Sequence, residues 1–124
     1  MNNKQKLRDE LKKAKKWAFD NLVGKKVYNK DIDEEVIFTK KGVKHAIYTK
    51  KYPLKTHLIY QAVNLLETST LLSKEKDKKG RKDIKNVYKL LNIFKYNNKE
   101  YSIYIVIRET KRGCIYFDHG VIKK

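Results

Sequence analysis

The sequence predicts an α+β domain in which N-terminal helices pack on a roughly four-stranded antiparallel sheet. The chain has 124 residues, a length that suits one domain over 1–124. Apolar residues recur at helical spacing in its first part and alternate with polar residues near its end, as they do in half-buried strands. Hydrophobic residues make up 40% of the chain, which is enough to build a core. We therefore expect one folded domain without a linker.

The first 23 residues are expected to form an amphipathic helix. Lysines dominate most of its faces, and one apolar stripe remains for packing on the sheet. Gly24 is suited to end the helix, because glycine readily adopts the left-handed conformation found after helix C-termini. The residues of the apolar stripe are Leu7, Leu11, Ala14, Ala18 and Leu22.

Two short strands and a short helix are expected next, within the segment 26–68. The strands cover Lys26–Asn29 and 35–38 and flank a polar turn. Thr39 is placed to cap a helix over 40–48, because a threonine hydroxyl can accept hydrogen bonds from the first turn. The residues expected on the open side of this helix are Lys44, His45 and Tyr48.

A second helix and a long polar segment follow. Pro53 suits the first turn of a helix over 54–68. Segment 73–83 contains no apolar residue, so we expect a solvated loop that is available to phosphates. An antiparallel meander is then expected over 85–119. Its three strands are predicted at 85–96, 101–110 and 114–119.

The strand 101–108 alternates most clearly, with isoleucines on one face and polar or aromatic residues on the other. The isoleucine face must meet the helices, so the other face displays Tyr104 and Arg108. A turn with Gly113 in the left-handed position places Arg108 opposite Tyr116. By strict alternation His119 belongs to the core side, and it reaches the open face only if the strand has ended or bulged there.

The open face admits two interpretations. Tyr104, Arg108 and Tyr116 together form a surface suited to a phosphate backbone. Alternatively, the face is merely solvated and holds an Arg108–Asp118 ion pair, which contributes little to stability.

The net charge points to a polyanionic partner. The chain carries 31 Lys and Arg against 14 Asp and Glu, a net charge of +17. Such a field attracts nucleic acid, an anionic membrane or an acidic protein. Nine tyrosines accompany the lysines and can stack on unpaired bases, which favours nucleic acid. The alternative is that lysine richness reflects an AT-rich genome and that the tyrosines are ordinary core residues.

Other function classes find little support in the sequence. No apolar run is long enough for a membrane helix, so no membrane partner is expected. A single cysteine, Cys114, excludes an internal disulfide and suggests a cytoplasmic protein. The three histidines lack metal-ligand spacing, and no cofactor motif occurs, so neither a metal nor a cofactor is expected.

The remaining chemistry suits metal-independent cleavage of RNA. That reaction needs a base for the ribose 2′-OH, cations for the phosphorane and an acid for the leaving oxygen. Histidine titrates near neutrality and can transfer either proton, whereas Lys and Arg can hold the phosphate. The candidate catalytic residues are Lys44, His45, Arg108, Tyr116 and His119. His57 is expected to be an ordinary surface or hydrogen-bonded residue.

Two stretches resemble a known nuclease group. The stretch V-I-F-T-K-K-G-V-K-H-A-I at 36–47 is similar to a strand-then-helix segment of phage and mobile-element nuclease domains. These domains belong to the barnase–EndoU–colicin–RelE-like superfamily. The stretch Y-S-I-Y-I-V-I-R-E-T-K-R-G-C-I-Y-F-D-H at 101–119 is similar to their closing hairpin. The layout over 25–122 also resembles a large polyvalent protein-associated domain of phages.

The resemblance implies helices on a four-stranded antiparallel sheet and a metal-independent ribonuclease, often a toxin against tRNA or mRNA. By position, Lys44 and His45 match the "K-H" of the helix, Arg108 matches the strand arginine, and Tyr116 and His119 match the closing strand. Members differ in their catalytic sets, so the resemblance does not decide which group is acid and which is base.

The first hypothesis is therefore an endoribonuclease that cleaves by attack of the 2′-OH, acting as a toxin or as a phage or mobile-element effector. Its expected partners are RNA (tRNA or mRNA) and an acidic inhibitor or immunity protein. The alternative is a non-catalytic nucleic-acid-binding accessory protein, and a third hypothesis is a protein that binds an acidic partner. The residues expected to bind RNA outside the catalytic set are Lys40, Lys41, Tyr48, Arg81 and Tyr104.

Overall fold

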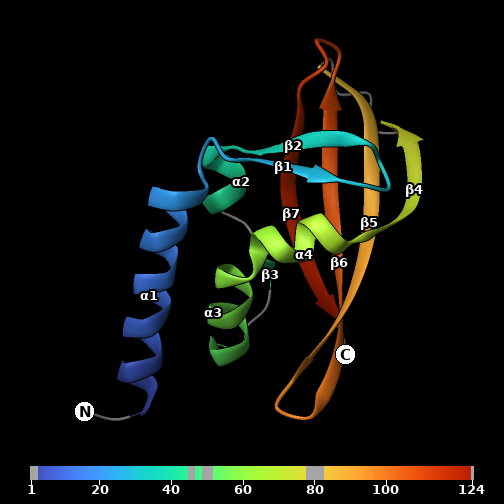
Figure 1. The fold of residues 1–124 in the computed structure, drawn as a ribbon. Helices are drawn as coiled ribbons and strands as arrows, with labels where there is room; N and C mark the ends of the chain where they lie inside the picture. The colour runs from blue at the N-terminus through green and yellow to red at the C-terminus, as the bar shows by residue number, and fades with distance from the viewer. Residues whose placement is uncertain (1–2, 45–46, 49–51, 78–82, 124) are drawn as a thin grey trace.

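A computed structural model describes the fold of residues 3–44, 47–48, 52–77 and 83–123 (Figure 1). These residues form an α+β fold, in which four helices and a curled sheet share one core. The helices are α1 (Asn3–Leu22), α2 (Lys40–Lys44), α3 (Tyr52–Tyr60) and α4 (Ala62–Thr68). The strands are β1 (Lys26–Asn29), β2 (Glu34–Phe38), β3 (Ile47–Tyr48), β4 (Thr70–Lys76), β5 (Ile84–Tyr96), β6 (Lys99–Thr110) and β7 (Ile115–Lys123).

The sheet is mixed and larger than predicted. In the described part of the chain, six strands follow the order β1-β2-β7-β6-β5-β4, and β3 adds to β7 as a seventh. β2 and β3 both run parallel to β7, whereas the other pairs are antiparallel. The expectation of a four-stranded antiparallel sheet was therefore wrong, although the α+β class is confirmed.

Helix α1 follows the prediction closely. Its apolar stripe packs into the core: Leu11, Ala14, Ala18 and Leu22 are buried. Gly24 has a φ of 84°, the left-handed conformation expected after the helix. Its backbone N–H donates to the Phe38 carbonyl at 2.7 Å, which attaches the end of α1 to β2.

The helix predicted over 40–48 is shorter than expected. Thr39 caps it as predicted, since its hydroxyl accepts a hydrogen bond from the Gly42 N–H at 3.0 Å. Helix α2 nevertheless ends at Lys44, because Ile47 and Tyr48 form β3 and pair with β7. Tyr48 therefore belongs to a strand, not to one helix with Lys44.

The helix predicted over 54–68 is divided into α3 and α4. The Gln61 N–H between them is shared by the carbonyls of His57 at 3.2 Å and Leu58 at 3.1 Å. After α4, residues up to Lys76 form the edge strand β4, although part of this segment was expected to be a loop. Lysines are common on edge strands, where they discourage pairing with other chains.

The β1–β2 hairpin curls back over the inner face of the sheet, as Figure 1 shows in front of β5, β6 and β7. The fully buried Asn29 anchors its tip, donating to the Leu66 carbonyl at 2.7 Å and to the Ser69 carbonyl at 3.0 Å. The Asp31 carboxylate accepts a hydrogen bond from the Leu71 N–H at 2.8 Å. These contacts join the hairpin to the start of β4, at the opposite end of the strand order.

The C-terminal meander matches the prediction in its turns. Asn97 and Asn98 have positive φ values of 50° and 62° between β5 and β6. Gly113 has a φ of 90° between β6 and β7. β7 extends beyond the predicted end at 119, to Lys123. No helix of the described residues has the length and apolar character needed to cross a membrane.

Candidate functional site

The outer face of the sheet, the one turned away from the helices, is defined by the alternation in β6. Tyr101, Ile103, Ile105 and Ile107 are buried, whereas the residues between them are partly exposed. Cross-strand partners share a face, so the register assigns the neighbours on β5 and β7. The outer face comprises Val87, Lys89, Leu91 and Ile93 of β5, Ser102, Tyr104, Val106 and Arg108 of β6, and Tyr116, Asp118, His119, Val121 and Lys123 of β7.

The register at Arg108 is the predicted one. Arg108 lies opposite Tyr116, and Ile107 lies opposite Phe117. This register confirms the prediction. The short turn with Gly113 in the left-handed conformation determines which residues of β6 and β7 pair, and the turn can be recognised in the sequence. Arg108 and Tyr116, which match the strand arginine and the closing strand in the resemblance, are thus neighbours on the outer face.

A β-bulge at Asp118 brings His119 to the same face. His119 pairs with Val106, while Phe117 pairs with Ile107, so Asp118 has no partner of its own on β6. The extra residue reverses the alternation of every later residue of β7. His119 therefore lies on the outer face, as expected from the sequence if the strand bulges before it.

Helix α2 packs against the edge of β7 beside this bulge. β7 pairs with β2 at Tyr116 and Phe117 and with β3 at Gly120 and Val121. Between these two pairings, the backbone of α2 lies directly on the strand. A Cβ atom added to Gly42 would lie 2.2 Å from the Phe117 carbonyl oxygen, so only glycine fits there.

The Asp118 carboxylate joins the two basic groups of the outer face. Its Oδ2 atom lies 2.6 Å from His119 Nδ1 and 3.5 Å from Arg108 Nη2. The three side chains are partly shielded, with exposures of 17% for Arg108, 26% for Asp118 and 22% for His119. Arg108 Nε is buried and has no hydrogen-bond partner within the described residues. The Arg108–Asp118 ion pair, which the sequence offered as the alternative for this face, is thus present, and His119 joins it to form a three-residue cluster.

The remaining predicted site residues are only partly placed. Lys41 and Lys44 are exposed on α2, which contacts β7. Lys40 extends over the Phe19 ring of α1, with Nζ 5.5 Å from the ring centroid. His45 and Arg81 lie outside the described residues, and so does the side chain of Tyr48.

Tyr104 occupies the other end of the outer face with a partner that the sequence did not reveal. The Lys123 Nζ atom lies 5.4 Å from the centroid of the Tyr104 ring. Lys123 reaches this face only because the bulge reversed the alternation of β7. A sequence-based search could have found it by allowing one extra residue at Asp118.

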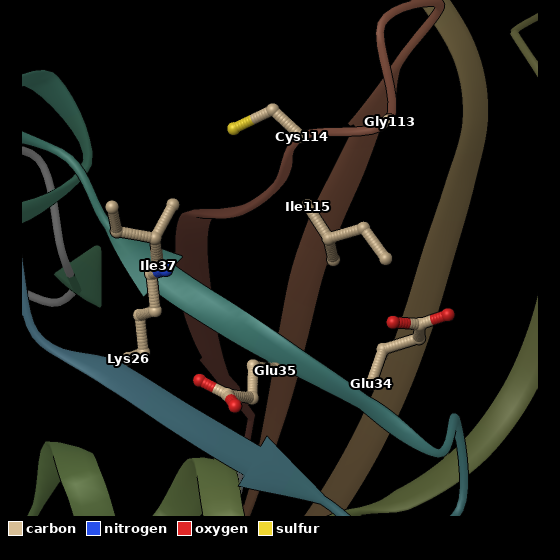
Figure 2. A pocket seen from close by; sticks show the side chains of 7 residues that line it. All are labelled: Lys26, Glu34, Glu35, Ile37, Gly113, Cys114 and Ile115. Carbon is tan, nitrogen blue, oxygen red and sulfur yellow. The ribbon is translucent and has the colours of Figure 1, made fainter.

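An opening of about 440 Å³ lies where β2 separates from β7 (Figure 2). β2 pairs with β7 only through Ile37 and Phe38, and its earlier residues diverge from the start of β7. The Glu34 and Glu35 carboxylates point to opposite sides in Figure 2, so they do not converge on one ligand. The lining residues are Lys26, Glu34, Glu35, Ile37, Gly113, Cys114 and Ile115.

A second polar cluster lies on the inner face. The Glu109 carboxylate accepts hydrogen bonds from Asn86 Nδ2 at 2.8 Å and from the Tyr88 hydroxyl at 3.1 Å. Burial and this hydrogen bond raise the pKa of Tyr88 to about 12. Donation from Asn86, followed by that from Tyr88, lowers the pKa of Glu109 against the opposing effect of burial. The cluster satisfies its own polar groups and joins β5 to β6.

No metal site emerges from the part of the chain that is described, since it holds no group of three or more His, Cys, Asp or Glu residues placed to bind an ion.

The comparisons with known proteins identify a family. The model of large polyvalent protein-associated domain 3 matches residues 5–117, which is 113 of the 124 positions, from α1 into β7. No curated protein matches the chain, and no solved structure matches it. The match confirms the part of the resemblance that concerned large polyvalent protein-associated domains. The chain belongs to the family of large polyvalent protein-associated domain 3.

Proposed function

We propose that the domain is a metal-independent endoribonuclease that cleaves RNA by attack of the ribose 2′-OH on the adjacent phosphate. One observation carries the proposal: the Asp118 carboxylate lies between His119 and Arg108 on the outer face of the sheet. The cluster combines a group that can transfer protons with a cation that can hold a phosphate. The net charge of +17 supports RNA as the partner, with tRNA and mRNA as the proposed substrates.

His119 is the proposed proton-transfer group. In the tautomer with a proton on Nδ1, the ring donates that proton to Asp118, which fixes its orientation. The other ring nitrogen, Nε2, would then exchange protons with the 2′-OH or with the leaving 5′ oxygen. Carboxylates orient catalytic histidines in this way in other enzymes.

Arg108 is the proposed phosphate-binding residue. A guanidinium presents five N–H donors in one plane and can bind two phosphate oxygens at once. Its charge would stabilise the phosphorane, in which negative charge increases on those oxygens. Tyr116, directly opposite on β7, would orient the phosphate or stack on a base. Lys44 of α2 remains a second candidate cation, and His45 a second candidate acid or base from the sequence.

The test is cleavage of total RNA in EDTA by the purified domain. We expect cleavage to continue in EDTA and to leave cyclic 2′,3′-phosphate ends. His119→Ala and Arg108→Ala should each reduce the rate, by about 10²–10³-fold for the lost phosphate contact of Arg108. Arg8→Ala, at an exposed position of α1, and His57→Ala, at an exposed position of α3, are the matched controls. Cleavage at the wild-type rate by both site variants would rule out this site.

A second candidate function is non-catalytic RNA binding by an accessory protein. The observation that favours it is the Asp118 carboxylate itself, which offsets the charge of Arg108 from 3.5 Å. In that case the same experiment would give a mobility shift of intact RNA. An acidic inhibitor protein remains a proposed partner for either function.

A further inference from the structure

We propose that the outer face binds single-stranded RNA, with one base stacked on Tyr104 and the strand continuing to Arg108. The proposal rests on the proposed function, because it places the cleaved phosphate at Arg108, and it names the class of substrate. It adds a base-binding position at the far end of β6, away from the Arg108–Asp118–His119 cluster.

The spacing along β6 supports two separate contacts with one strand. Tyr104 and Arg108 share the outer face and are four residues apart, so about 13 Å separates their positions. Adjacent nucleotides of a helical strand rise by only 3.4 Å along the axis. This separation leaves room for a base on Tyr104 and a phosphate at Arg108 to belong to different nucleotides of one strand.

The surroundings of Tyr104 suit a flat, apolar base. Its cross-strand neighbours are Leu91 of β5 and Val121 of β7, both only partly buried. Ile93, two residues further along β5, is 55% exposed. Ile93 lies diagonally across from Tyr104 on the same face, so it extends the apolar surface that unpaired bases can contact.

Charge complementarity identifies the occupant as a nucleic acid. Lys123 lies over the Tyr104 ring with Nζ 5.4 Å from its centroid, and Lys89 is exposed on β5. A base that stacks on the ring would displace the Lys123 ammonium toward the neighbouring phosphate. Lys123 thus exchanges a cation–π contact for a phosphate contact. An aromatic ring beside basic side chains is an arrangement that proteins use to bind single-stranded nucleic acid.

The substrate must be single-stranded at this position. In a duplex, each base is paired and stacked between its neighbours, so its face is not available to Tyr104. Unpaired bases stack on aromatic rings with little sequence preference, because every base has a flat face. A loop or an end of a structured RNA would satisfy the same requirement.

The experiment measures binding by fluorescence anisotropy with a 2′-O-methyl RNA of about 10 nucleotides, which lies within the usual site sizes. This probe lacks the 2′-OH, so it cannot be cleaved and reports binding alone. We expect the single strand to bind at least tenfold more tightly than the same strand annealed to its complement. Tyr104→Leu should weaken binding about 5- to 100-fold, whereas Tyr104→Phe, which keeps the ring, should bind like the wild type.

Lys123→Ala tests the phosphate contact, with Lys16→Ala on α1 as the control that removes the same charge elsewhere. The slope of log affinity against log salt concentration should fall by about 0.7 for Lys123→Ala and remain unchanged for the control. Equal binding of the duplex, wild-type binding by Tyr104→Leu, or equal effects of the two lysine variants would overturn the inference. Binding through Tyr104 without cleavage of natural RNA would instead refute the proposed function alone.

Discussion

His119 and Asp118 are sequence neighbours on β7, yet their side chains meet, with His119 Nδ1 2.6 Å from Asp118 Oδ2. Adjacent residues of a regular strand point to opposite faces, so this contact depends on the bulge. Arg108 lies 3.5 Å from the same carboxylate, so the bulge adds His119 to an ion pair that regular alternation already allows. The position of the proposed proton-transfer group therefore depends on one irregularity in the sheet.

Asp118→Asn separates the two effects of the carboxylate. We expect RNA cleavage to fall by about 10²-fold or more, since the amide no longer holds and stabilises the His119 imidazolium. Binding of the uncleavable 2′-O-methyl strand should become tighter, because Arg108 loses its counter-charge. Single-turnover kinetics measure cleavage, and fluorescence anisotropy measures binding. Asp20→Asn, at an exposed position of α1, is the control. Unchanged values for both would show that Asp118 serves neither role.

Gly42→Ala tests the close packing of α2 on β7. The new methyl group would lie 2.2 Å from the Phe117 carbonyl oxygen, so the helix must move away from the bulge. We expect a loss of about 1–3 kcal/mol in the free energy of unfolding, measured by urea denaturation. Lys41→Ala, at the preceding and exposed position, should change it by less than about 0.5 kcal/mol. Equal stability of the two variants would contradict the observed packing.

Asn29→Ala tests the connection between the hairpin tip and the start of β4. The substitution removes a donor from the carbonyls of Leu66 and Ser69, although the Leu66 carbonyl keeps a longer hydrogen bond from the Ser69 N–H at 3.4 Å. It also removes the acceptor of the Asp31 and Ile32 N–H groups. Each orphaned buried group costs about 1–3 kcal/mol, so we expect the free energy of unfolding to fall by about 3 kcal/mol. Asn21→Ala, on the exposed side of α1, is the comparison. Similar urea midpoints for the two variants would be inconsistent with this role.

Glu109 should make the stability of the domain dependent on acidic pH. Hydrogen bonds from Asn86 and Tyr88 lower its pKa in the folded state below the ordinary 4.5. Its contribution is therefore complete above the unfolded-state pKa and is lost as the pH falls through the folded-state pKa. Thermal melting of the wild type and of Glu109→Gln between pH 7 and pH 3 measures this. The stability difference between the two proteins should change below about pH 4.5 in favour of the variant, and a constant difference would argue against the prediction.

Local patterns predicted the elements whose form depends on nearby residues. The stripe of α1, the positive φ of Gly24 and the turn at Gly113 follow from residue type and spacing. The register of Arg108 against Tyr116 followed from that turn. These features needed no knowledge of distant segments.

Tertiary contacts decided the elements that were missed. β3 consists of two residues and exists because Gly120 and Val121 of β7 offer them a partner. β4 looks like a loop in sequence, but it completes the sheet by pairing with β5. The bulge at Asp118 cannot be recognised from the residues around it either. The sequence indicated only that His119 would reach the outer face if such a bulge were present.

The bulge makes the proposed site sensitive to chain length as well as to residue type. Losing one residue between the Gly113 turn and Gly120 would remove the bulge but leave the later pairs unchanged. His119 would still lie opposite Val106, but the residue before it would pair with Ile107 and turn inward, so two adjacent residues could no longer share the outer face. Among relatives of this domain, the number of residues in this short interval would thus distinguish copies that can assemble the cluster from those that have lost it.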